Sequence, residues 1–139
     1  MKNYILSCAI FSLIACADNR DINIEEGVWQ SAHLVDVMQT FHGAASDPCY
    51  KEGDPVTRFI VGSEPTHAAV AGWGIGFSLI HFGVTTWLTD HDFYDAAGVW
   101  EFISIGETGW DLGHNYSIGI RLGRPNTDYW YCPLAGKVK

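Results

Sequence analysis

The stretch from Pro65 to Thr89 constrains the fold most, because these 25 consecutive residues contain no Asp, Glu, Lys or Arg. A helix of that length measures about 37 Å, and the hydrocarbon core of a bilayer is about 30 Å thick. Ala68, Gly72 and Gly76 recur every fourth residue, and faces of small residues let helices approach closely in lipid. The stretch therefore predicts a membrane-spanning helix. The alternative is the central, buried helix of a soluble bundle.

Two other segments have helical patterns. Asn23 to Glu26 resembles a capping box, and apolar residues at helical spacing follow it up to Gly43. Prolines and polar residues between 43 and 63 predict a loop, and 90–97 is an acidic connector. A third helix follows, with small residues again four apart. We therefore expect an all-α fold of about three helices (24–41, 65–89 and 98–122) in a small, membrane-embedded bundle.

The N-terminus has the features of a bacterial lipoprotein signal. A short positive start precedes twelve uncharged residues, and Leu13-Ile14-Ala15-Cys16 fits the lipobox. We expect cleavage before Cys16 and acylation of its thiol, which would anchor the protein durably. An ordinary signal peptide or an uncleaved first helix are the alternatives. The expected divisions are a signal peptide (1–15), a lipidated tether (16–23), a helical domain (24–123) and an irregular tail (124–139).

The distribution of positive residues agrees with three membrane crossings. A lipid on Cys16 places the start of the mature chain outside the inner membrane, so that 42–66 and the tail lie inside. Most positive residues then lie inside, as the positive-inside rule requires: Lys51, Arg58, Arg121, Arg124, Lys137 and Lys139. We expect a location in the bacterial cell envelope, with the inner membrane favoured and the outer membrane left open. The first helix is polar for a span, so it could instead lie in the interface.

Composition excludes one class of partner. The formal net charge is −8 and the chain has no basic patch, which argues against nucleic-acid binding. Of the four cysteines, Cys49 and Cys132 remain free after processing. In an exported protein such a pair is a candidate disulfide, and two free thiols are the alternative.

Polar residues within the helical segments predict a polar site inside the bundle. Glu107, Asp111 and His114 share one helical face, which is expected to meet the first helix. Such a site could bind a divalent metal or pass protons, or it could only provide hydrogen bonds between helices. Apart from the covalent lipid on Cys16, we expect no cofactor, and no catalytic motif is recognisable. The predicted site residues are His33, Asp36, Glu107, Asp111, His114 and Asn115.

Three stretches carry a resemblance: WQSAHLVDVMQT (29–40), VGSEPTHAAVAGW (61–73) and GHNYSIGIRLG (113–123). They resemble an uncharacterised family of small helical membrane proteins of bacteria and phages. The chain departs from that pattern at Glu64, where a histidine is more usual, and in having a lipobox. The resemblance implies helices and membrane association, and a phage context such as exclusion of other phages, without a mechanism.

These observations favour a non-enzymatic, lipid-anchored envelope protein that acts through contacts with another envelope protein or with itself. One alternative is a small membrane protein that binds a metal or protons. The other is a soluble periplasmic helical domain on a lipid anchor.

Overall fold

The computed structural model describes residues 19–44, 51–52, 55–120 and 122. Its elements are α2 (Asn19–Gln39), a π-helical turn η1 (Thr40–Ala44), α3 (Pro55–Val61), α4 (His67–Asp90) and α5 (Tyr94–Ser117). No strand occurs among the described residues. The expectation of an all-α fold is therefore confirmed.

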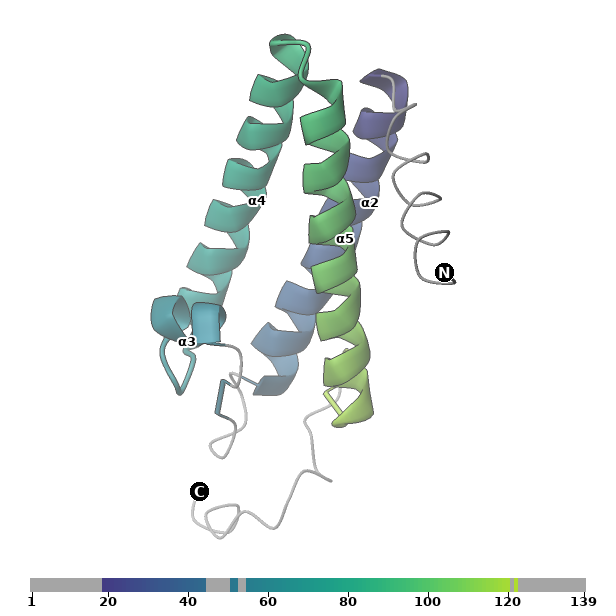
Figure 1. Ribbon diagram of the computed structural model, residues 1–139. Coiled ribbons are helices and arrows are strands. Elements are labelled where there is room, and N and C mark those ends of the chain that lie inside the picture. The colour runs from purple at the N-terminus through teal and green to yellow at the C-terminus, as the bar shows by residue number, and fades with distance from the viewer. Residues whose placement is uncertain (1–18, 45–50, 53–54, 121, 123–139) are drawn as a thin grey trace, which may run out of the picture.

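The three long helices α2, α4 and α5 run side by side along one axis (Figure 1). α2 and α5 point the same way, and α4 runs antiparallel to both. The start of α2 lies at the same end as the turn between α4 and α5, whereas η1, α3 and the end of α5 lie at the other end. The chain thus traverses the length of the bundle three times.

The first helix is longer than predicted. It begins at Asn19 rather than at 24, so the predicted tether is partly helical, and it continues through Gly43 as η1 instead of ending there. The capping-box prediction is wrong, because Glu26 lies in the second turn with its side chain buried in the bundle. Gly43 serves packing, since a Cβ there would lie 2.8 Å from Cγ2 of Ile120.

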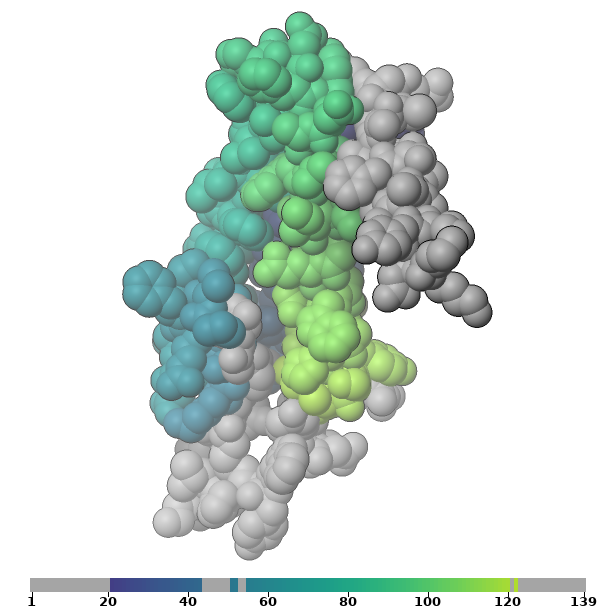
Figure 2. Space-filling view, viewed as in Figure 1, coloured from purple at the N-terminus to yellow at the C-terminus, as the bar shows by residue number. Residues whose placement is uncertain are grey.

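A short helix, α3, occupies part of the predicted loop. Pro55 stands at its first position, where the missing N–H costs no hydrogen bond. Gly62, with a φ of 89°, ends it in the left-handed conformation. The segment projects from the side of the bundle (Figure 2), and Phe59 is 89% exposed. Beside it, the hydrogen bond and charge of the Lys51 ammonium, 2.9 Å from Glu64, hold the pKa of Glu64 below its ordinary value.

Local backbone and capping interactions set where α4 begins and where α5 ends. The Thr66 hydroxyl accepts a hydrogen bond from the Ala69 N–H at 3.2 Å, so α4 begins at His67 and not at Pro65. The predicted acidic connector shortens to a tight turn in which Asp92 has a φ of 60°. α5 ends at Ser117, earlier than predicted, because Gly119 adopts a left-handed φ of 89°.

The burial pattern is inverted relative to a water-soluble bundle. Among the described residues, the buried apolar set is short: Ile22, Trp29, Val61, Val70, Ala97 and Ile120. The buried polar set is longer: Glu26, His33, Gln39, Glu52, His81, Thr85, Glu101, Ser104 and Thr108. Large apolar side chains cover the outside instead, among them Leu79 of α4 and Phe102 of α5. Soluble helices bury their apolar stripe, so this surface is unusual for contact with water.

α4 is the one helix in the described part of the chain that is long and apolar enough to cross a membrane. Its best 18-residue window has a mean hydropathy of 1.4, and only 22% of that window is buried. The core helix of a soluble protein passes the same test of length and composition but is mostly buried. The exposure of α4 therefore argues against the predicted alternative of a central, buried helix.

The close approach of α2 and α4 occurs at Gly74, where a Cβ would lie 2.7 Å from Cγ1 of Val37. The close approach does not involve the face of small residues that the four-residue spacing predicted on α4 (Ala68, Gly72 and Gly76). A Cβ at Gly72, Gly76, Gly109 or Gly113 would meet nothing within 4 Å. The faces formed by these small residues are therefore open on the outside of the bundle.

Candidate functional site: a buried carboxylate and histidine centre

Three ionisable side chains, one from each long helix, meet in the interior: Glu26 from α2, His81 from α4 and Glu101 from α5. Nδ1 of His81 lies 2.9 Å from Oε2 of Glu26 and 4.0 Å from Oε1 of Glu101. The exposed fractions are 7% for Glu26 and 0% for the other two residues. This Glu26–His81–Glu101 centre forms only when all three helices pack together.

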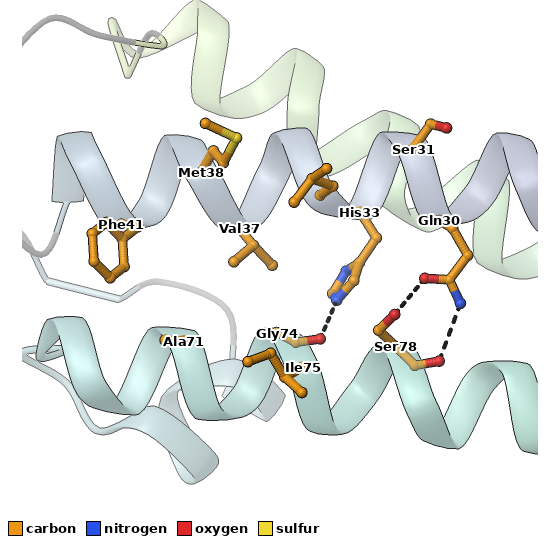
Figure 3. Close-up of a pocket in the computed structure, with 11 residues that line it drawn as sticks. Gln30, Ser31, His33, Val37, Met38, Phe41, Ala71, Gly74, Ile75 and Ser78 are labelled. Carbon is orange, nitrogen blue, oxygen red and sulfur yellow. Dashed lines mark hydrogen bonds between the residues drawn. The ribbon is translucent and has the colours of Figure 1, made fainter.

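Neutral side chains hold one oxygen of each carboxylate. Nε2 of Gln30 donates to Oε1 of Glu26 at 2.6 Å, and the Thr85 hydroxyl donates to Oε1 of Glu101 at 2.6 Å. Gln30 is itself held by Ser78, whose hydroxyl donates to the amide oxygen and whose backbone carbonyl accepts from the amide nitrogen (Figure 3). These bonds fix how the carboxylates are turned, and they leave Oε2 of Glu26 directed at His81.

Two tryptophans fix the imidazole ring of His81. Trp29 stacks on it with ring centroids 3.6 Å apart and planes 9° apart, and Trp100 stacks on it at 4.8 Å and 29°. Trp29 also stacks on His33, at 4.7 Å. Because the ring is sandwiched, His81 cannot turn away from the carboxylates without displacing a buried indole.

The positive charge that the described residues can supply to the centre is that of His81 itself, when its ring is protonated. Among the residues that the structure describes, no Lys or Arg side chain forms an ion pair with Glu26 or Glu101. Oε2 of Glu101 and Nε2 of His81 are buried without a hydrogen-bond partner. Two ionised carboxylates cannot be buried together without a compensating positive charge. Burial of both carboxylates therefore requires either a proton on one of these groups or a bound cation.

The residues predicted as a site fall into three groups. Asp36 accepts a hydrogen bond from Asn115 at 2.7 Å, and the negative charge of Asp111 repels that of Asp36. These three residues therefore lie close together. His33 is apart from them, with Nε2 3.1 Å from the Gly74 carbonyl oxygen. Glu107 and His114 are exposed. The predicted single face of the third helix is thus divided between interior and surface.

None of the three residues of the Glu26–His81–Glu101 centre was among the predicted site residues. Asp36 is ten residues beyond Glu26 on α2, about 15 Å along the axis, so the predicted group lies elsewhere in the bundle. The signal available was that single ionisable residues stand among apolar neighbours in mid-helix, which in membrane proteins marks a functional position. Helical spacing within one segment cannot show which residues of different helices meet.

A groove of about 510 Å³ lies between α2 and α4 beside the centre (Figure 3). Its lining is mostly apolar, with Val37, Phe41 and Ile75 along its length. Its polar part is formed by Gln30, Ser31, His33 and Ser78. The amide of Gln30 also donates a hydrogen bond to Glu26, and so joins the groove to the centre.

Comparison with protein-family models, curated proteins and solved structures finds no match to this chain. The resemblance to small membrane proteins of bacteria and phages therefore stays a prediction. Cys16, Cys49 and Cys132 lie outside the described residues, so lipidation and the disulfide also stay predictions.

Proposed function

We propose that this chain is a lipid-anchored integral protein of the bacterial envelope that works by holding a proton or a metal cation inside its helical bundle. The observation that carries the proposal is the inverted burial, with carboxylates and histidines inside and large apolar side chains outside. In lipid the apolar exterior is solvated by acyl chains, and ionisable residues within membrane helices almost always face the protein interior, as Glu26, His81 and Glu101 do. Glu107 of α5, which is exposed, is an exception.

Helix lengths support embedding in a bilayer. α2 has 21 residues and α4 and α5 have 24 each, which correspond to about 31 and 36 Å. A hydrocarbon core of about 30 Å matches these lengths.

The charges at the two ends of the bundle support an orientation. Asp21, Asp90 and Asp92 lie at the end that holds the α4–α5 turn, together with Arg20 (Figure 1). Lys51 and Arg58 lie at the opposite end, together with Glu52 and Glu64. The positive-inside rule then favours a cytoplasmic position for α3 and an outer position for the turn. A lipid on Cys16 would lie on the outer side as well, in agreement with the start of α2 at that end.

The interior favours a cation-binding role over catalysis. Ionisable residues inside membrane bundles commonly serve proton relays and ion sites. No described serine or cysteine makes a hydrogen bond with the centre, whereas its two carboxylates and imidazole are groups that exchange protons or ligate metals.

Action through protein contacts is a second candidate. The observation in its favour is that the small faces at Gly72 and Gly76 on α4, and at Gly109 and Gly113 on α5, are open within the chain. Such faces commonly pack against other helices in lipid. If the protein acts in this way, Gly76→Leu reduces the size of its complex in detergent, and an unchanged complex argues for the interior role alone.

Cys16→Ser separates the lipid anchor from the embedded helices. The wild type is expected to incorporate labelled palmitate and the variant is not. Both are expected to stay in the membrane pellet after a carbonate wash, because three helices rather than the lipid retain them. Release of the variant by carbonate would refute embedding and would favour a soluble domain on a lipid anchor.

A further inference from the structure

We propose that the Glu26–His81–Glu101 centre is a binding site for one divalent first-row transition-metal cation. This inference rests on the proposed interior cation-binding role and selects the metal over the proton. The three side chains present one ligand atom each, and these atoms all lie within 4.8 Å of one another.

The distances fit one shared ion. Nitrogen and oxygen ligands of a tetrahedral zinc lie about 2.0–2.2 Å from the metal, and therefore about 3.3–3.5 Å from one another. The separations of 2.9 Å and 4.0 Å from Nδ1 of His81 to the two carboxylates bracket that value.

The charge balance also fits. Two carboxylates and one neutral imidazole around a divalent cation give a net charge of zero, which is what a site without bulk water requires. An imidazole ligand favours zinc, iron, cobalt or nickel over magnesium and calcium, which prefer oxygen ligands alone.

The surroundings resemble the outer shell of a metal site. Gln30 and Thr85 each hold one oxygen of a carboxylate, as outer partners of metal ligands do. Oε2 of Glu101 is buried without a hydrogen-bond partner, so this carboxylate keeps one oxygen free to bind an ion while Thr85 holds the other. Three protein ligands would leave a further position for water or for a bound molecule.

Equilibrium uptake of Co²⁺ and Zn²⁺ by the purified, lipidated protein in detergent tests the site. One Co²⁺ per chain is expected, with visible absorption bands that Zn²⁺ abolishes. Glu101→Gln preserves the size of the side chain and the oxygen that accepts from Thr85, but removes the charge. Its affinity for Co²⁺ is expected to fall by more than the about 10–100-fold typical of losing an outer-shell partner.

Glu107→Gln is the matched control, because Glu107 lies on the same helix and is exposed. It is expected to bind Co²⁺ as the wild type does. Wild-type protein that binds no stoichiometric Co²⁺, while the Cys16→Ser variant stays in the carbonate-washed pellet, would overturn the metal site and leave the membrane bundle standing. Equal binding by Glu101→Gln would overturn this ligand set. Release of the Cys16→Ser variant by carbonate would instead overturn the embedding, whatever the metal content.

Discussion

Trp29→Ala is expected to lower the free energy of unfolding by about 3 kcal/mol or more, within the range for removing a buried tryptophan. Trp29 is fully buried and stacks on His33 and His81. Its removal would leave a cavity between α2 and α4 and would free the imidazole of His81 to turn. In lipid the loss comes mainly from packing contacts, because lipid tails are as apolar as the protein interior. Equilibrium unfolding of the detergent-solubilised protein measures the loss.

Trp110→Ala is the matched control for that experiment. Trp110 is 74% exposed on α5, so its removal leaves no internal cavity. The free energy of unfolding is expected to change by less than about 0.5 kcal/mol, as is usual for surface substitutions. Similar losses from both variants would show that Trp29 is not enclosed by the bundle.

Gly74→Ala is expected to lower the free energy of unfolding by about 1–3 kcal/mol, which is the usual cost of overpacking. The added methyl group would lie 2.7 Å and 2.8 Å from the two γ-carbons of Val37. α2 and α4 would have to separate, which would also lengthen the bond between His33 and the Gly74 carbonyl. Val37→Ala makes room for the methyl group, so the double variant is expected to lose less than the sum of the single losses.

Gly76→Ala provides the comparison on the same helix. A Cβ there meets nothing within 4 Å, and alanine is the better helix former by about 1 kcal/mol. This variant is expected to be as stable as the wild type or more so. Equal destabilisation by both alanines would place the contact between α2 and α4 elsewhere.

Much of the fold could be predicted from the sequence, because it depends on local patterns. The uncharged stretch at 65–89 corresponds to α4, and the helical patterns around it correspond to α2 and α5. The errors occurred where local signals compete. Pro55 was taken as a loop residue although a proline also fits the first turn of a helix, as in α3. Gly119, inside the predicted range 98–122, provides the left-handed residue that ends α5.

From the sequence, an interior polar site could be expected, but the residues that form the Glu26–His81–Glu101 centre could not be identified. Polar residues inside apolar helices indicated an interior site, and Asp36, Asp111 and Asn115 do lie together. The partners of His81 depend on how three helices rotate about their own axes. That rotation is set by contacts such as Gly74 on Val37, which join residues 37 positions apart. No spacing within a single segment carries this information.

The environment of Leu79 tests the central claim, that the apolar exterior faces lipid, most directly. Leu79 is 67% exposed near the middle of α4, and Asp92 is exposed in the turn that follows. A nitroxide attached through Leu79→Cys, or through Asp92→Cys, with Cys49 and Cys132 replaced by serine, reports collisions with oxygen and with a polar nickel chelate in native membranes. The account predicts that oxygen and not the chelate reaches the label at 79, and that the chelate reaches the label at 92. Free access of the chelate to both labels would contradict embedding in the bilayer.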